Sequence, residues 1–405
     1  MNATDLRISA RWIWDGIDAT PRPGSVVIEG GRVARIEPIE PQEARALPPT
    51  LLTVGLANAH VHLDLTTERP TEQLEGPFTD WLAGVRDFRH EQGDEGLERA
   101  AARGIEASLA SGVTLVIDDD PRGWSLVPFA HSPLRRVVMR EVIALTPFAL
   151  ALDDLEAFLE GSTDPARELR SLTPHAPYTV HPEVLPILLD RLDRDALPWA
   201  MHVAESAWER QFLTSGEGEG AEFLRRFGVD PKEYARGASA VEQLARGGRL
   251  DRRALIVHGN HLSGEEIATL ARTKSPVAYC PRSHAFFRHP AHPFPRLLEA
   301  GVPVVFGTDG AISAGSVSLL EEMRFAHAAH PQVPAEEFWR AATSTVREYL
   351  GGEFGSGTIA PGEPADLVRW SVPEGDSPGA IPLGAVLAGG HSLETWIDGK
   401  SVHRA

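Results

Sequence analysis

The chain has 405 residues, 42% of them hydrophobic and 24% charged, which is enough for one large enzyme domain with a smaller one appended. Its formal net charge of −18 at pH 7 argues against nucleic acid or an anionic membrane as partner, because both need a basic face. The single cysteine, Cys280, excludes an internal disulfide and a cysteine-based structural zinc site.

The first residues, MNATDLRISARW, lack the basic stretch and apolar core of a secretion signal. No apolar run approaches the length of about eighteen residues that a membrane-spanning helix needs. We therefore expect a soluble, cytoplasmic protein without a membrane partner. The sequence leaves open whether it forms a homo-oligomer.

The two ends of the chain resemble each other. Residues 7–37 consist of short β-rich runs separated by glycine pairs, which is typical of hairpins, and residues 357–404 have the same texture. We expect residues 1–53 and 353–405 to pair into one small β-sandwich domain.

Between the ends, β-branched or apolar runs alternate with amphipathic helical stretches. Such alternation over residues 54–352 favours a parallel sheet, and eight strand candidates favour a closed (β/α)₈ barrel of the TIM type, although a doubly wound α/β sheet would explain the pattern nearly as well. Helix signals support the alternation, since Ser263 and Glu266 form a capping-box pattern and Gly301 is placed to end a helix. The strand candidates are Thr50–Asp64, Val113–Asp118, Arg136–Leu145, Ser171–His175, Trp199–Glu205, Ala254–Asn260, Val277–Pro281 and Val302–Asp309.

Histidines follow the predicted strands. His60 and His62 form a His-x-His pair at the end of the first strand, where residues two apart project from the same face about 6–7 Å from each other. Alone, this pair would more often be two polar residues on an exposed strand. The pattern recurs, however, and the C-terminal ends of barrel strands are where active sites are built. The other polar residues at strand ends are His175, His202, His258 and Asp309.

Imidazoles and a carboxylate that converge in this way suit Zn²⁺, with Fe²⁺ or Mn²⁺ as alternatives. The set of motifs resembles the amidohydrolase superfamily, in its branch of cytosine-deaminase-like, adenosylhomocysteine-deaminase-like and chlorohydrolase-like enzymes. The resemblance covers nearly the whole chain, from VVIEGGRVARIEP through NAHVHLDL, PFTDWL, HAPYT, HVAES, HGNH, CPRSH and GTDG to GTIAPGEPADLV. It implies that His60, His62, His202 and Asp309 are metal ligands, and that Glu205, His258 and His175 act on the substrate and the attacking water.

The resemblance also implies one metal ion per chain. Related enzymes with two ions bridge them with a modified lysine from the fourth strand, but the three lysines here, Lys232, Lys274 and Lys400, lie at no strand end of the predicted barrel. Two positions depart from the family pattern: Val54 replaces the usual proline, and Gly310 replaces the usual serine after the metal aspartate. The second departure puts a substrate contact by that hydroxyl in doubt.

The residue types allow a hydrolytic mechanism. Asp309 can bind the ion and take a proton from the attacking water, which His258 orients. Glu205, three residues after His202, can donate a proton to the substrate ring, although an acidic residue at a helix N-terminus would be favourable in any protein. His175 is interpreted as a substrate-binding residue because four ligands already complete the metal site.

Three further features are less specific. The run Asp118–Asp120 is interpreted as a solvated turn. Arg282 and His284 follow the seventh strand and are predicted to bind substrate. Arg140, on the third predicted strand, is explained equally well as an internal ion-pair partner and as a functional residue.

The segments CPRSHAFF and PFTDWL are similar to those of aminofutalosine deaminases of menaquinone biosynthesis. This implies a nucleoside substrate, 6-aminodeoxyfutalosine, whose acid would be bound by Arg282 and His284. The alternatives are a deaminase of S-adenosylhomocysteine, methylthioadenosine or adenosine, and a triazine or guanine hydrolase. A metal-free relative that serves only as a scaffold is disfavoured because no ligand is missing. Another class of zinc-dependent deaminases binds its zinc ion with a Cys-x-x-Cys pair. The single cysteine of this chain excludes that class.

Overall fold

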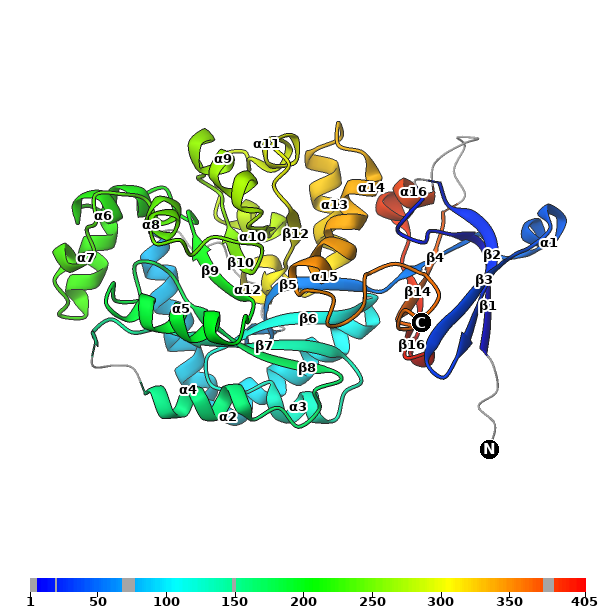
Figure 1. Ribbon diagram of the computed structural model, residues 1–405, viewed down its shortest axis with the longest axis horizontal. Coiled ribbons are helices and arrows are strands. Elements are labelled where there is room, and N and C mark those ends of the chain that lie inside the picture. Colours follow the sequence, from blue (N-terminus) through cyan, green and yellow to red (C-terminus); the bar gives the residue numbers. More distant parts are fainter. Residues whose placement is uncertain (1–5, 19, 68–76, 148–150, 374–381) are drawn as a thin grey trace.

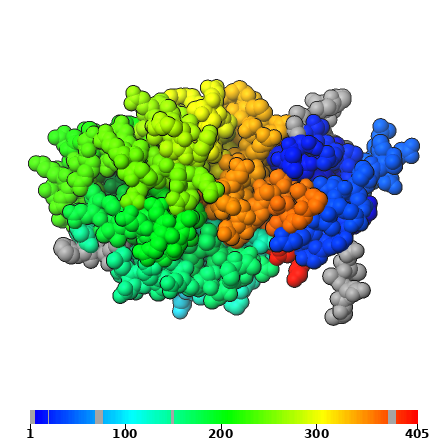
Figure 2. Space-filling model, viewed as in Figure 1, coloured from blue at the N-terminus to red at the C-terminus, as the bar shows by residue number. Residues whose placement is uncertain are grey.

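The computed structural model describes residues 6–18, 20–67, 77–147, 151–373 and 382–405. It shows an α/β fold in which parallel strands and helices occupy the middle of the chain, while strands from both chain ends lie side by side at one end of the molecule (Figure 1). In the space-filling view, the orange segment near residue 350 lies between the blue N-terminal part and the green central part (Figure 2).

The parallel strands form two sheets. The first has the order β13-β5-β6-β7-β8 and the second β12-β11-β10-β9. Nearly every residue of these strands is buried, because helices and loops cover the faces of parallel sheets, and this explains their continuous apolar runs. The strands are β5 (Leu56–His62), β6 (Val113–Asp120), β7 (Arg135–Val142), β8 (Glu168–Pro174), β9 (Trp199–Val203), β10 (Ala254–His258), β11 (Val277–Tyr279), β12 (Val304–Phe306) and β13 (Asp309–Gly310).

The two parallel sheets meet at both of their edges. Next to β8 and β9, the backbone N–H of His202 donates to the carbonyl oxygen of His175 at 2.9 Å. Next to β12 and β5, the N–H of Thr308 donates to the carbonyl oxygen of His60, also at 2.9 Å. The strand ends that carry the predicted site residues are therefore brought to one place.

Helices connect the parallel strands and pack around them. The predicted capping box is present, with the Glu266 N–H donating to Ser263 Oγ at 3.3 Å and the Ser263 N–H donating to Glu266 Oε2 at 2.7 Å. Helix α2 is interrupted at Gly93, whose φ of 61° lies outside the helical region. The helices are α1 (Pro41–Ala46), η1 (Leu63–Leu65), α2 (Phe78–Ala110), α3 (Leu126–Ala130), α4 (Leu152–Glu160), α5 (Val184–Arg194), α6 (Glu209–Ser215), α7 (Glu219–Arg226), η3 (Pro231–Glu233), α8 (Ala240–Arg246), α9 (Gly264–Thr273), α10 (Pro281–Phe286), α11 (Phe294–Glu299), α12 (Ala311–Ala314), α13 (Leu319–Ala329), α14 (Ala335–Ala341), α15 (Ser344–Tyr349) and α16 (Pro382–Gly389).

The chain ends share a seven-stranded sheet with the order β16-β15-β14-β4-β1-β2-β3. Its N-terminal and C-terminal halves join where β4 pairs with β14. Among the described strands, the two ends form this one sheet, and the second layer of a sandwich is not among them. The strands are β1 (Leu6–Ile13), β2 (Arg22–Glu29), β3 (Arg32–Pro38), β4 (Thr50–Val54), β14 (Leu367–Ser371), β15 (Ser392–Ile397) and β16 (Lys400–Arg404).

The predicted strand Thr50–Asp64 is in fact two strands of different sheets, β4 and β5, which separate at Gly55. A Cβ atom at Gly55 would lie 2.2 Å from Thr114 Oγ1, so only glycine permits this close approach. The chain thus leaves the terminal sheet and enters the parallel sheet within one residue.

No helix in the described residues is both long and apolar enough to cross a membrane.

Candidate functional site

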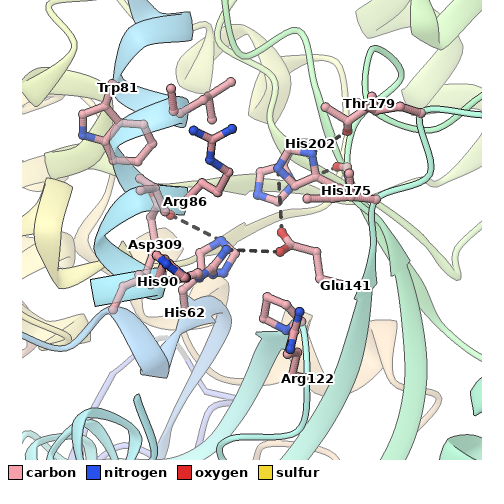
Figure 3. Close-up of a pocket in the computed structure, with 18 of the residues that line it drawn as sticks. His62, Trp81, Arg86, His90, Arg122, Glu141, His175, Thr179, His202 and Asp309 are labelled. Atoms are coloured by element: carbon pink, nitrogen blue, oxygen red, sulfur yellow. Dashed lines mark hydrogen bonds and ion pairs between the residues drawn. The ribbon is translucent and has the colours of Figure 1, made fainter. Parts of the chain in front are cut away.

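A cavity of about 710 Å³ opens beside the C-terminal ends of the parallel strands (Figure 3). Its lining combines side chains from strand ends with side chains from α2 and from the loop after β6. Five lining residues lie at or just beyond the ends of parallel strands, and the buried His60 packs against one of them, His62. We call these six residues the floor: His60, His62, His202, Glu205, His258 and Asp309. Each is at most 6% exposed, so its charge and hydrogen bonds are decided by protein neighbours.

His60 and His62 point to the same side of β5, as their spacing predicts. The ring centroids are 4.9 Å apart, and both Nε2 atoms lie 3.7 Å from Asp309 Oδ1. Nδ1 of His62 donates to the carbonyl oxygen of Asp119 at 3.0 Å, which leaves Nε2 with a free lone pair facing the carboxylate.

His202 is held in the same way, because its Nδ1 donates to the carbonyl oxygen of His175 at 2.8 Å. Its ring centroid lies 4.9 Å from that of His60. Burial lowers the pKa of His202 to about 4, and burial followed by the charge of His60 holds the pKa of His62 well below its usual value. Both rings are therefore neutral at pH 7, which is the form that binds a metal ion.

Two carboxylates complete this cluster. Asp309 Oδ2 accepts hydrogen bonds from the hydroxyls of Ser283, at 2.6 Å, and Ser313, at 3.0 Å, while Oδ1 faces the imidazoles. Asp119 Oδ2 lies 3.2 Å from Nδ1 of His60, and its Oδ1 accepts a hydrogen bond from Thr173 at 3.1 Å. Asp119 thus orients His60 from behind, whereas Asp309 offers a free oxygen to the centre of the cluster.

The arrangement fits a divalent metal ion. The ligand atoms of His60, His62, Asp119 and His202 all lie within 4.8 Å of one another. Nε2 of His60 is fully buried without a hydrogen-bond partner, which is costly unless another group uses its lone pair. Burial opposes a charge on His60, yet the nearby Asp119 and Asp309 raise its pKa to about 10. The two carboxylates make the cluster attractive to positive charge, and imidazole with carboxylate is a common zinc set.

Glu205 and His258 lie next to the cluster. Nε2 of His258 is 3.3 Å from Glu205 Oε1. Burial, followed by the charge of Asp309, raises the pKa of Glu205 well above its usual value, which favours the protonated form of this carboxyl. Glu205 precedes α6 by several residues, and the acid in the first turn of that helix is Glu209. The explanation of Glu205 as a helix-terminal carboxylate therefore does not hold.

His175 lines the cavity beside His202, with ring centroids 4.8 Å apart. Its Nδ1 hydrogen-bonds Thr179 Oγ1 at 2.6 Å, and its Nε2 lies 3.7 Å from Glu141 Oε1. Glu141 in turn lies 3.5 Å from Arg89. Glu141 and Arg89 were not singled out from the sequence. Glu141 lies in the middle of the predicted strand Arg136–Leu145, whereas the observed strand β7 ends one residue after it, at Val142.

The interpretation of Asp118–Asp120 as a solvated turn is wrong. All three side chains are at most 2% exposed. Asp118 accepts a hydrogen bond from the Leu63 N–H at 3.0 Å, and Asp119 orients His60. Asp120 closes the following loop by accepting hydrogen bonds from the Arg122, Gly123 and Ser125 N–H groups. A run of acids looks solvated in sequence, but here each carboxylate has its own buried donors.

Arg282 and His284 are not brought to the cavity. The chain enters α10 directly after Cys280, and Arg282 donates to Ser316 Oγ at 2.9 Å and lies 3.7 Å from the buried Glu322. His284 Nε2 donates to the carbonyl oxygen of Pro290 at 2.8 Å. Arg140 stacks on Phe158, with its guanidinium carbon 4.6 Å from the ring centre. None of these three lines the cavity.

Comparison with known proteins places these observations in a family. The model of the family described as "Amidohydrolase family" matches residues 51–402. The aminodeoxyfutalosine deaminase of Nitratiruptor sp. is 28% identical over 338 residues, which cover 80% of each chain. The 5-methylthioadenosine/S-adenosylhomocysteine deaminase of Nitratidesulfovibrio vulgaris is also 28% identical, over 90% of this chain and 83% of that one. The structure of a zinc-bound adenosine deaminase from Xanthomonas campestris shares the fold, with a TM-score of 0.81, 23% identity and coverage of 98% and 92%.

Proposed function

The chain belongs to the amidohydrolase family, and from this premise we propose that it is a metal-dependent deaminase of an adenine-type nucleoside, 6-aminodeoxyfutalosine, that releases ammonia. The observation that carries the proposal is the floor of the cavity, where Glu205, whose pKa is raised by burial, lies beside a histidine–aspartate cluster. Two kinds of deaminase among the similar proteins support the reaction type, and the Nitratiruptor protein supports the substrate.

We propose that His60, His62, His202 and Asp309 hold one divalent ion, with zinc favoured and iron or manganese as alternatives. We assign to Asp119 the role of positioning His60, because its Oδ2 lies 3.2 Å from Nδ1 of His60 and its Oδ1 accepts a hydrogen bond from Thr173. A bound ion of this kind acts as a Lewis acid and lowers the pKa of water to about 7.

The floor residues divide the proton transfers. Asp309 Oδ1 is free to accept a proton from the attacking water, since Oδ2 is held by Ser283 and Ser313. Glu205 donates its proton to the ring nitrogen beside the carbon under attack. A new carbon–oxygen bond forms at that carbon, and the carbon–nitrogen bond to the exocyclic amine breaks. The amine leaves as ammonia with the proton that Asp309 took from the water, and the hydroxyl proton of the adduct passes to Glu205 as the carbonyl forms.

The remaining floor and wall residues position the reactants. His258 Nε2 lies 3.3 Å from Glu205 Oε1, which supports its proposed role in orienting the water that attacks. His175 is held by Thr179 and faces the cavity, which supports its proposed contact with the substrate. Arg282 and His284 have protein partners outside the cavity, so we do not include them in the proposed contacts.

We also propose that the two parallel sheets close into a (β/α)₈ barrel spanning residues 54–352. The hydrogen bonds from His202 to His175 and from Thr308 to His60 support closure at both seams. Residues 1–53 and 353–405 then form the small β domain, whose two halves meet where β4 pairs with β14.

A second candidate is deamination of S-adenosylhomocysteine or methylthioadenosine, which the Nitratidesulfovibrio protein supports. Ammonia release from four nucleosides separates the candidates: 6-aminodeoxyfutalosine, S-adenosylhomocysteine, methylthioadenosine and adenosine. We expect the highest kcat/KM for 6-aminodeoxyfutalosine. A higher value for S-adenosylhomocysteine would transfer the assignment to the second candidate, and ammonia from none of the four would overturn the deaminase proposal.

A further inference from the structure

The cavity changes the sign of its charge between its base and its opening. The carboxylates Glu141, Glu205 and Asp309 line the base and are buried. Among the described residues that line the cavity, the exposed cations are Arg86 and Arg122, and together with the exposed His90 we call them the mouth. Arg86 and His90 lie on α2, whereas Arg122 lies in the loop after β6. Figure 3 shows Arg86 and Arg122 on opposite sides of Glu141 in that view.

The backbone of Arg122 is fixed, but its guanidinium is free. Asp120 accepts hydrogen bonds from the N–H groups of Arg122, at 2.9 Å, and Gly123, at 2.6 Å, so the loop is anchored to the buried end of β6. Across the described ranges of the chain, the Arg122 side chain has neither a hydrogen bond nor an ion-pair partner. The Arg122 guanidinium is therefore carried by an anchored loop and is available to bind a ligand.

Arg86 is held only loosely by the protein. Its ion pair with Asp87, at 2.8 Å, joins neighbours in the chain that are 62% and 63% exposed, and such pairs contribute little in water. Its guanidinium carbon lies 5.8 Å from the ring centre of Phe227. Among the described residues that line the cavity, the exposed acid is Asp94, which already accepts a hydrogen bond from Trp124 at 2.9 Å. Within this described lining, a ligand carboxylate would therefore meet more cationic than anionic groups at the mouth.

Apolar side chains also line the cavity. They come from α2, the loops after β6 and β7, and α7: Trp81, Leu82, Trp124, Ile143 and Phe223. Trp81 is held against Phe287, with ring centroids 4.9 Å apart. This wall suits an apolar or aromatic arm, because aromatic faces stack on planar groups.

We propose that Arg86 and Arg122 bind a carboxylate at the far end of the substrate, and that the cavity selects nucleosides whose ribose carries an apolar or aromatic arm ending in an acid. This inference rests on the proposed function, which places the amino group of the base on the floor and so directs the opposite end of the nucleoside to the mouth. Guanidinium groups suit this task because they bind carboxylates with two parallel hydrogen bonds. The proposal assigns recognition of the substrate carboxylate to α2 and the loop after β6. The sequence predicts instead that Arg282 and His284 bind this carboxylate.

The test compares kcat/KM for an acid-bearing nucleoside, 6-aminodeoxyfutalosine, with that for a neutral one, methylthioadenosine. Methionine keeps the length and apolar bulk of arginine without its charge, so Arg86→Met and Arg122→Met are made singly and together. Loss of a charge-assisted hydrogen bond should lower the ratio of the two kcat/KM values about 10–100-fold in each single variant. High salt should lower the ratio of the wild-type protein in the same direction.

Two controls accompany these variants. Arg99 lies on the same helix, is 67% exposed and lies 3.6 Å from Glu95 only, so Arg99→Met should leave both kcat/KM values unchanged. Arg282→Met should keep the wild-type ratio, and Arg282→Lys serves if loss of the partner of Glu322 unfolds the methionine variant. The ratio does not depend on the folded fraction, since both substrates are turned over by the same sample.

An unchanged ratio in the double variant would overturn the inference, as would a fall in the ratio confined to the Arg282 variants. These outcomes differ from failure of the proposed function, in which the wild-type protein would release ammonia from neither nucleoside.

Discussion

The floor and the mouth of the cavity both carry charged groups, but the protein holds them in opposite ways. On the floor, His62, His202 and Asp309 each have a hydrogen-bond partner that points one atom toward the centre. At the mouth, the guanidinium groups of Arg86 and Arg122 are exposed and have a weak partner or none in the described chain. Groups that perform chemistry must be fixed before the substrate arrives, whereas groups that select a substrate can take it as their partner.

The backbone shows the same contrast. Ala204, His258 and Asp309 have φ values of 53°, 69° and 58°, a left-handed conformation that non-glycine residues rarely adopt. His258 and Asp309 belong to the floor, and Ala204 lies between the end of β9 and the floor residue Glu205. Strain of this kind persists only where surrounding contacts impose it, and it is found at functional sites. Among the described residues of the mouth, Arg86, His90 and Arg122 show no such backbone.

The sharpest test of this contrast is removal of a metal ligand. His202→Ala should lose its bound metal and at least about 10³-fold in kcat, because the ion contributes several kcal/mol to transition-state stabilisation. Elemental analysis and ammonia release measure the two losses together. His131→Ala, at an exposed position outside the cavity, should change neither. Full metal content in His202→Ala would contradict the ligand set.

A floor residue that binds no metal should separate chemistry from metal binding. Glu205→Gln keeps the size of the side chain but cannot deliver its proton, so kcat should fall about 10²–10⁴-fold with metal content unchanged. The exposed Glu217→Gln is the matched control. Turnover near the wild-type value in Glu205→Gln would remove this residue from the proton transfers.

A smaller effect on kcat is expected for a residue that contacts the floor without belonging to it. His292 is 4% exposed, stacks on Tyr279 with ring centroids 3.8 Å apart, and its Nε2 donates to the carbonyl oxygen of His258 at 2.9 Å. His292→Phe keeps a ring but loses the donor, so kcat should fall about tenfold, which is the value of one hydrogen bond. His292→Gln restores an N–H group and should recover part of the loss. Equal activity of the two variants would show that the hydrogen bond does not position His258.

The smallest expected effect concerns stability and pH. Glu209 is buried and accepts hydrogen bonds from the N–H groups of Ala204, at 2.8 Å, and Glu205, at 3.3 Å. Burial raises the pKa of Glu209 to about 8, above its value in the unfolded chain. Its contribution to the free energy of unfolding is therefore present below about pH 4.5 and is lost as the pH rises through 8, by a few kcal/mol at most.

Glu209→Gln cannot ionise, so its melting temperature relative to the wild-type protein should increase between pH 5 and pH 8. Arg86→Met, at the mouth, should show a constant difference over the same range. A constant difference for both variants would show that Glu209 ionises as an ordinary carboxyl.

Much of the floor could be predicted from the sequence because its signals are local. His60 and His62 lie two residues apart on one strand, and His202 and Asp309 each follow an apolar run, so periodicity and strand ends alone point to one site. The family resemblance is confirmed by the match over residues 51–402. The pairing of the two chain ends in one sheet is likewise present in the structure.

The errors arise where a long-range contact overrides a local pattern. Thr50–Asp64 looks like one strand, but the approach of Thr114 to Gly55 divides it between two sheets. The sequence of Asp118–Asp120 looks like a solvated turn, but the side chains are buried. The Leu63 N–H donates to Asp118 and the Thr173 hydroxyl donates to Asp119.

The mouth gave no sequence signal of this kind. Arg86 lies on a helix with other charged residues. In the sequence, this pattern looks the same as the solvent-exposed face of any helix. Arg282 follows a strand end as the floor residues do, but α10 begins at Pro281 and turns it toward Glu322. Whether a charged side chain enters a cavity depends on how the helix packs, and the sequence pattern does not contain that information.

The most direct test of the account is the fate of the substrate amine in the presence and absence of the metal. Metal-free protein, prepared with a chelator and then reloaded with zinc, is incubated with 6-aminodeoxyfutalosine in water enriched in heavy oxygen. The account predicts that only the reloaded protein releases ammonia, in an amount equal to the product, and that the product carries one heavy oxygen atom on the base. Reloaded protein with about one zinc ion per chain that releases no ammonia from this or any other adenine nucleoside would contradict it.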